Sequence, residues 1–254
     1  MTLKTLLLSA FLFISSGSLY ANETVTIEYL KPNDAQEQQY KEIIENSPTV
    51  AQVQQLITQN FALSRPLLIT FGGEEGPLFD PQLNQIFVPY HFLTEIEARF
   101  SKEKYSESGV SVETAVMDSL VHTLLHEFGH ALIAMHDLPV LGKEEDAVDG
   151  FANIMLIAHF KEGAEMVISA ADLFDFESSD RTELSAPDFW DEHSLDLQRY
   201  FTSICHVYGS DPDKYDELLK SEEMLEERGE FCLQEYNNLE FSWYSLLEKY
   251  QITK

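Results

Sequence analysis

The sequence predicts an α+β fold in which the strands come early and the helices come late. Two runs, Pro66 to Gly73 and Asn84 to Phe92, are rich in β-branched and aromatic residues, which favour strands. From Ser111 onward the apolar residues recur every three to four positions, as is typical of helices. No alternation of strands and helices is visible, which favours an α+β domain.

The chain of 254 residues begins with a segment that is typical of an export signal. Lys4 gives a positive start, Leu6 to Ile14 is apolar, and small residues precede Ala21. The apolar run is too short to span a membrane; a buried N-terminal helix is the alternative. We therefore expect a signal peptide over residues 1–21 and a single domain over residues 22–254. The protein is predicted to be exported, periplasmic or secreted, with no membrane insertion after cleavage.

The charge of the chain is strongly negative. The formal net charge is −28, from 16 basic and 44 acidic residues. Removing the signal removes one lysine and no acid, so 15 basic residues remain against 44 acidic ones, which gives −29. Such a surface repels nucleic acid and anionic membranes, so we exclude nucleic acid as a partner.

The two cysteines, Cys205 and Cys232, suit an oxidising compartment. In an exported chain they predict one disulfide, and two buried thiols are the alternative.

The N-terminal half contains the other predicted helices and the second predicted strand. Residues 33–61 predict one or two helices, with a break at Pro48. The run from Asn84 to Phe92 follows a turn-rich loop, and Pro89 indicates that this strand is an edge strand or ends there. An edge strand near Asn84 to Val88 could hold an extended peptide by main-chain hydrogen bonds; ordinary sheet structure is the alternative.

The C-terminal half is predicted to be mainly helical. One helix begins at Ser111 and runs to about Met135, and a second begins near Glu144 after a turn that contains proline and glycine. Residues 175–192 predict a long polar loop, and the chain is helical again from Leu195.

The first of these two helices contains the motif HEFGH, residues 126–130. His126 and His130 are four residues apart, so a helix places both imidazoles on one face, where they can share a metal ion. Glu127 lies beside the place of a bound water. This arrangement is typical of zinc hydrolases, in which the glutamate acts as general base.

A catalytic zinc needs a third protein ligand, and the start of the next helix supplies acidic candidates. Glu145 is our preferred ligand, because Asp149 lies four residues further on the same helix face and can accept the N–H of a ligating histidine. Glu144 and Asp146 are rivals without such a partner, and acids that merely cap the helix are the remaining alternative.

Two other histidines lie near the motif. His122 extends the same helix face, but three ligands spread over eight residues of a straight helix are geometrically poor, so we interpret it as a neighbour of the site. His136, at the end of the helix, is expected to be exposed.

The motifs together carry a resemblance to a known family. HEFGH followed by EEDAVD resembles the gluzincin pattern, H-E-x-x-H with a later E-x-x-x-D. With DEHSLDLQRYF, CHVYGSDP and ERGEFC, the string resembles an uncharacterised bacterial family of metallopeptidases that is classed as a domain of unknown function. This resemblance covers most of the chain after residue 21. The gap from His130 to Glu145 is shorter than in thermolysin-like gluzincins, which leaves less room between the two helices.

The resemblance implies a zincin-like fold: a small sheet with an edge strand packed on an active-site helix, followed by a mainly helical C-terminal half. It implies Zn²⁺ as cofactor, His126, His130 and Glu145 as ligands, and Glu127 as base. Enzymes of the thermolysin type place a late histidine at the developing oxyanion. By resemblance His193, which has acids on both sides, is the best candidate for that role, ahead of His206, His159 and Tyr208; an exposed loop histidine is the alternative.

The function expected from these features is zinc-dependent hydrolysis, with a peptide or protein as substrate. Two alternatives remain open at this point. One is an exported zinc-binding protein without turnover, and the other is a zinc amidohydrolase that acts on a non-protein amide.

Overall fold

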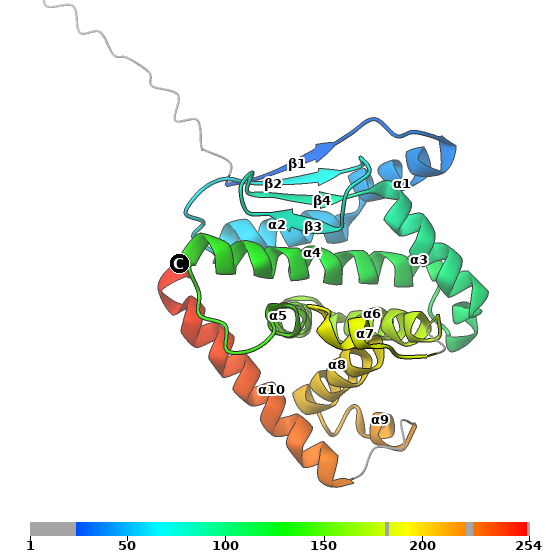
Figure 1. The fold of residues 1–254 in the computed structure, drawn as a ribbon, viewed down its shortest axis with the longest axis vertical. Coiled ribbons are helices and arrows are strands. Elements are labelled where there is room, and N and C mark those ends of the chain that lie inside the picture. The colour runs from blue at the N-terminus through cyan, green and yellow to red at the C-terminus, as the bar shows by residue number, and fades with distance from the viewer. Residues whose placement is uncertain (1–23, 181–182, 222–225, 253–254) are drawn as a thin grey trace, which may run out of the picture.

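The computed structural model describes residues 24–180, 183–221 and 226–252 (Figure 1). The predicted signal peptide, residues 1–21, lies outside these ranges. A small sheet and a larger set of helices form an α+β fold, which confirms the predicted class. No helix in the described part of the chain combines the length and the apolar character needed to cross a membrane.

The sheet is mixed and has the strand order β1-β2-β4-β3. Strands β1, β2 and β4 are parallel, and β3 runs antiparallel to β4. The strands are β1 (Val25–Tyr29), β2 (Leu67–Phe71), β3 (Leu78–Asp80) and β4 (Gln85–Val88). Two helices connect β1 to β2: α1 (Ala35–Asn46) and α2 (Pro48–Asn60).

This topology contains a βαβ unit that the sequence did not show as an alternation of strands and helices. Strand β1, helices α1 and α2, and the parallel strand β2 form a βαβ crossover. The sequence did not reveal it because β1 is five residues long and only Val25 in it is buried, so its apolar pattern is weak. The break between α1 and α2 at Pro48 is confirmed, and the Ser47 side chain caps α2 by accepting the Val50 N–H.

The edge strand is not the one that we expected near Asn84 to Val88. Strand β4 is Gln85–Val88 and pairs on both sides, with β2 and with β3. Pro89 ends β4 and precedes helix α3 (Tyr90–Lys102). The edge strands of the sheet are instead β1 and β3. Strand β3 has three residues, lies within the predicted turn-rich loop and is too short to be recognised by its pattern.

The two helices predicted around the motif are confirmed. Helix α4 is Val112–His136, and the Ser111 side chain caps it by accepting the Thr114 N–H. Helix α5 is Glu144–His159, and three acids in its first turn complement the helix dipole. Residues 175–192 are only partly a loop, because helices α6 (Gly163–Ser178) and α7 (Ala186–Trp190) extend into them. The remaining helical elements are η1 (Tyr105–Ser108), α8 (Asp196–Ser210), α9 (Asp216–Ser221), α10 (Glu226–Leu247) and η2 (Glu248–Tyr250).

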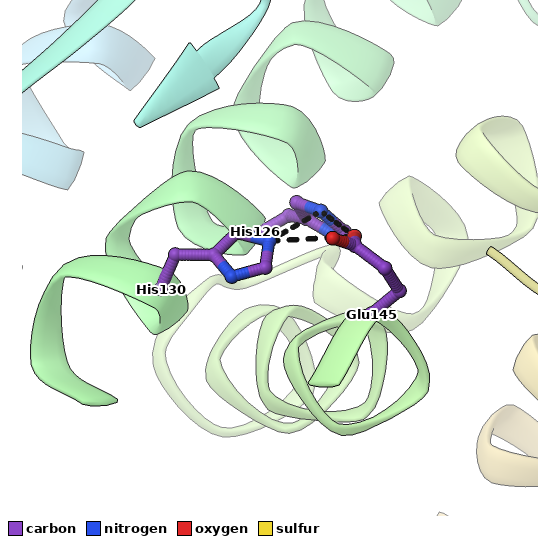
Figure 2. A group of neighbouring side chains, drawn as sticks. All are labelled: His126, His130 and Glu145. Carbon is purple, nitrogen blue, oxygen red and sulfur yellow. Dashed lines mark hydrogen bonds and ion pairs between the residues drawn. The ribbon is translucent and has the colours of Figure 1, made fainter. Parts of the chain in front are cut away.

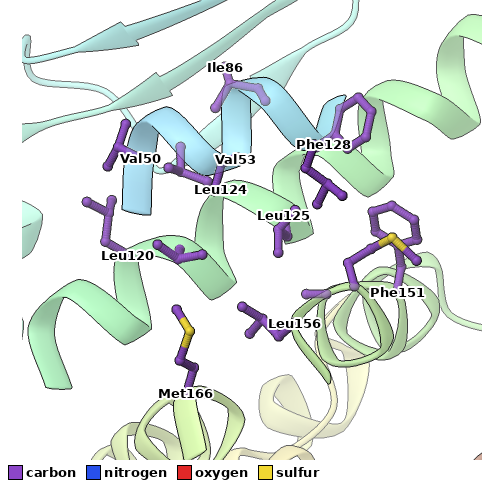
Figure 3. Packing of buried hydrophobic residues seen from close by; sticks show 14 of the residues in the cluster. Val50, Val53, Ile86, Leu120, Leu124, Leu125, Phe128, Phe151, Leu156 and Met166 are labelled. Carbon is purple, nitrogen blue, oxygen red and sulfur yellow. The ribbon is translucent and has the colours of Figure 1, made fainter. Parts of the chain in front are cut away.

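Helix α4 lies at the centre of the molecule, with the sheet on one side and α5 and α6 on the other (Figure 1). Most of its apolar side chains are buried, and each buried Leu or Phe contributes about 1.5–3 kcal/mol. Figure 3 shows the packing around it, with side chains from α2, β4, α4, α5 and α6. The helix that carries the motif is therefore held rigidly from both sides.

The predicted disulfide is confirmed. Cys205 of α8 and Cys232 of α10 are bonded. The bond fastens α8, which packs against α5 and α6, to the long C-terminal helix. It thereby ties α10 to the part of the chain that contacts the motif.

Candidate metal centre

The two histidines of the motif meet a glutamate from the next helix. His126 and His130 project from one face of α4, and Glu145 projects toward them from the first turn of α5 (Figure 2). The Nε2 atoms of the two histidines are 3.3 Å apart. The Glu145 Oε2 atom lies 3.1 Å from His126 Nε2 and 3.3 Å from His130 Nε2. One oxygen and two nitrogens thus form a nearly equilateral triangle.

Glycine within the motif explains how α5 comes this close. A Cβ atom added at Gly129 would lie 2.9 Å from Cγ1 of Val148. Any larger residue at this position of HEFGH would therefore push α5 away from α4. Because Gly129 allows α4 and α5 to pack in direct contact, the short connection from His130 to Glu145 is sufficient to bring Glu145 to the histidines.

The other ring nitrogens of both histidines bond to carboxylates. His126 Nδ1 is 2.7 Å from Asp149 Oδ1, and His130 Nδ1 is 2.8 Å from Glu144 Oε1. A carboxylate accepts, so each Nδ1 carries the proton and each Nε2 keeps its lone pair in the neutral ring. The two Nε2 lone pairs and the Glu145 carboxylate are therefore directed toward the same point.

The Glu145 Oε2 atom has no hydrogen-bond partner within the described ranges, although it is buried. Its contacts to the histidine nitrogens have the distance of ion pairs without the geometry of hydrogen bonds. A buried carboxylate oxygen without a hydrogen bond costs free energy unless a cation compensates it. The donor set needs positive charge at its centre.

A zinc ion fits this donor set by distance and by chemistry. Zinc binds imidazole nitrogen and carboxylate oxygen at about 2.0–2.1 Å, so tetrahedral geometry separates two such donors by about 3.3 Å. The separations here are 3.1 to 3.3 Å. Within the described chain these three residues form a compact group of metal-binding side chains.

Asp149 is itself held by Arg199, a residue of α8 that sequence reasoning missed. Arg199 Nε is 2.7 Å from Asp149 Oδ2, and its Nη2 is 2.9 Å from Oδ1. The guanidinium also lies over the Phe174 ring, 3.8 Å from the centroid. No local pattern could have identified Arg199, because fifty residues separate it from Asp149.

The electrostatics of the cluster favour a cation. Burial lowers the pKa of His126, but the hydrogen bond to Asp149 and the Glu145 carboxylate outweigh it and raise the pKa to about 9. Burial raises the pKa of Glu145, but the three neighbouring imidazoles hold it well below its usual range. The pKa of Asp149 is also held low against burial, chiefly by Arg199. Glu145 and Asp149 are therefore charged at neutral pH.

Glu127 lies beside the donor set in an open cleft of about 610 Å³. Burial raises the pKa of Glu127, and the charges of His126 and His130 oppose that shift. The cleft is bounded on one side by β3 and its flanking prolines and on another by the segment that contains His193. Its lining residues include Pro77, Leu78, Phe79, Pro81, Glu127 and His193.

His193 also reaches the donor set, from the segment between α7 and α8. Its Nε2 atom is 3.0 Å from Glu145 Oε2, and its ring is stacked on His126 with centroids 6.3 Å apart. It is nevertheless not part of the compact group formed by His126, His130 and Glu145. The nearby Glu145 carboxylate raises the pKa of His193. The rivals Glu144 and Asp146 contact His130 and Ser194 respectively.

The other histidines lie apart from the donor set. His122 is buried and its Nε2 is 3.1 Å from Asn153 Oδ1, while His206 Nδ1 is 3.1 Å from Asn153 Nδ2. His136 is half-buried and stacks on Tyr250 with centroids 3.7 Å apart, so the expectation that it is exposed was wrong. The expectation overlooked the C-terminal segment, which returns to the end of α4. His159 and Tyr208 are not among the residues that line the cleft.

Comparison with known proteins yields one family. Neither the curated proteins nor the solved structures gave a match. Residues 29–247 match the family described as "Putative metallopeptidase". This range covers nearly all of the described chain, including the motif helix, α5 and the His193 segment. The chain therefore belongs to this metallopeptidase family.

Proposed function

We propose that this protein is an exported, zinc-dependent peptidase of the zincin-like type, with His126, His130 and Glu145 as ligands. One observation carries the proposal: three donors from two helices lie 3.1 to 3.3 Å apart, and the carboxylate oxygen has no hydrogen bond in the described chain. This spacing matches the separation of donors around a tetrahedral zinc. The bonds to Asp149 and Glu144 leave both Nε2 atoms available as ligands.

When bound, zinc would lower the pKa of a water molecule and polarise the substrate carbonyl. Glu127 is the general base: its carboxylate takes the proton of the attacking water and passes it to the leaving amine. Burial raises the pKa of Glu127, which suits a group that must both accept and release a proton near neutral pH. Asp149 fixes the tautomer and orientation of His126, and Arg199 holds Asp149.

His193 is proposed to stabilise the oxyanion that forms as the water attacks. Its imidazole is 41% exposed and lines the cleft next to Glu145. The nearby Glu145 carboxylate raises the pKa of His193, which favours the protonated ring that donates to an oxyanion.

An extended peptide is the substrate that the shape of the cleft favours. Strand β3 pairs with β4 on one side, and its residues Leu78 and Phe79 line the cleft. A peptide can add to such an edge by main-chain hydrogen bonds. The edge strand that serves this role is β3, rather than the expected run near Asn84 to Val88. This open edge favours a peptidase over an amidohydrolase for small amides.

A structural zinc site without turnover is disfavoured. Such sites close with four protein ligands, whereas the compact donor set here has three. A buried carboxylate, Glu127, also lies in the cleft beside the donors without belonging to them. The disulfide is compatible with the proposed export.

The test is hydrolysis of a diverse peptide mixture by the mature chain, compared with Glu127→Gln. We expect about one zinc per chain in both proteins, and turnover slower in the variant by about a hundredfold to ten-thousandfold. Elemental analysis and mass spectrometry of the products measure the two quantities. If the protein contains no zinc after dialysis against a zinc solution, the proposed metal site is refuted. Equal turnover in both proteins would refute the role of Glu127.

A further inference from the structure

The segment that carries His193 has little packing to hold it. Between Glu183 and Arg199 no residue is fully buried, and helix α7 contains no buried side chain. Asp191 and His193 line the main cleft and also a second hollow of about 160 Å³. Space thus lies on two sides of this segment, and hydrophobic burial cannot fix the position of the His193 ring.

Polar contacts to the start of α5 take the place of packing. Lys143 Nζ donates to the carbonyl oxygen of Asp191 at 3.1 Å and to that of His193 at 2.8 Å. Ser194 Oγ donates to Asp146 Oδ2 at 2.9 Å. Lys143 directly precedes α5, whose first turn also provides Glu145. The segment is therefore tied to the same helical turn as the proposed third ligand.

Charge makes Lys143 the more important of these contacts. Among the described residues that line the cleft it is the one lysine or arginine, whereas Glu144, Glu145, Asp191 and Glu192 are acidic. The acids of α5 repel those of the His193 segment, and the ammonium lies at their junction. Without it, repulsion and the loss of two charge-assisted hydrogen bonds both favour movement of the segment away from α5.

We propose that Lys143 is a positioning residue that holds His193 against Glu145. Its catalytic consequence rests on the proposed function, whereas its effect on the segment does not. Lys143 touches main-chain oxygens and acts on the reaction only through the place of the His193 ring. Any residue that donates two hydrogen bonds and carries a positive charge at this position should do the same.

The experiment compares Lys143→Met, Lys143→Arg and a matched control, Lys161→Met. Lys161 lies two residues beyond the C-terminal end of α5 and its side chain is 93% exposed, so its replacement makes the same charge change away from the cleft. Hydrogen–deuterium exchange of residues 183–196 in the mature chain is measured first. We expect exchange roughly tenfold faster in Lys143→Met, and exchange like that of the wild type in the other two proteins. Unchanged exchange in Lys143→Met would overturn the proposal.

Kinetics on the same proteins separate positioning from mere stability. Lys143→Met should lower kcat roughly tenfold with KM changed less than twofold, because a misplaced group weakens chiefly the transition state. Lys143→Arg should restore kcat. In a His193→Ala background, Lys143→Met should cause no further loss.

Two kinetic results would contradict the proposal. A kcat of Lys143→Met equal to that of Lys161→Met would exclude a positioning role, and a further loss in the His193→Ala background would show that Lys143 acts independently of His193. If the wild-type chain hydrolyses no peptide while exchange is faster in Lys143→Met, the proposed function fails and the hold of Lys143 on the segment stands.

Discussion

The histidines on and around α4 form two groups, which differ in the chemistry of their hydrogen-bond partners. His126 and His130 bond to carboxylates and face an open cleft. His122, one turn earlier on α4, bonds to the amide of Asn153. The same amide contacts His206 and Ser203 of α8, so this second group is a neutral network sealed between three helices.

The pKa values of the two groups diverge for that reason. Carboxylates raise the pKa of His126 to about 9 in spite of burial. Burial lowers the pKa of His122 and of His206 to about 4, because the charges of Asp149 and Glu235 offset only part of the lost hydration. Whether an imidazole can take part in binding a cation depends more on its hydrogen-bond partner than on the helix face from which it projects. The three predictions below test this contrast, beginning with the largest effect.

The first prediction compares one histidine from each group. His130→Ala should raise the dissociation constant for zinc by more than about a hundredfold, since even partners outside the ligand set account for about 10- to 100-fold. His122→Gln removes a more deeply buried imidazole from the same helix and should keep zinc within a few-fold. Competition with a chelator measures both constants. Equal zinc affinity in the two variants would show that the histidine partners do not determine the site.

The zinc motif could be recognised from the sequence because its residues are local. His126, Glu127 and His130 belong to one helix, and the spacing alone sets their relation. Glu145 could be favoured over its neighbours because Asp149 follows four residues later on the same helix. In the structure both acids contact His126, as that reasoning expects.

The parts that the sequence did not reveal depend on long-range contacts. Arg199 reaches Asp149 from fifty residues away, and Lys143 reaches the carbonyls near His193 from a similar distance. Strands β1 and β3 are too short or too exposed to show a pattern, so the βαβ crossover and the true edge strand were missed. Helix periodicity, by contrast, predicted α4 and α5 to within a few residues.

The second prediction concerns Arg199, whose positive charge holds Asp149 beside His126. Arg199→Met leaves Asp149 buried without its guanidinium, which should cost about 3–5 kcal/mol of unfolding free energy. Zinc affinity should fall about 10- to 100-fold, because Asp149 would no longer be fixed against His126. Arg228→Met is the control: it removes an exposed ion pair with Glu235, which is worth at most about 1 kcal/mol. Urea unfolding of the metal-free proteins measures the free energy of unfolding of each variant. A similar loss of this free energy in both variants would show that the burial of the Arg199–Asp149 pair does not matter.

The third prediction concerns the neutral network and pH. The pKa of His122 and of His206 is about 4 in the folded chain, below the ordinary value of 6.5. Between these values the unfolded chain binds protons that the folded chain does not, so stability falls as the pH falls. From pH 6.5 to 5.5 the loss should be about 1 kcal/mol for each histidine.

Other groups titrate in the same window with the opposite sign, so the measurement must be a difference. Burial raises the pKa of Asp118 to about 6, and carboxylates raise that of His126, and both shifts favour the folded chain as the pH falls. The metal-free wild type is therefore compared with a His122→Gln, His206→Gln double variant by urea unfolding at both pH values. These other groups are common to both proteins and largely cancel, so the wild type should lose about 2 kcal/mol more than the variant. An equal change in both proteins would mean that the two imidazoles titrate in the folded chain as they do in the unfolded chain, and the contrast between the two histidine groups would disappear.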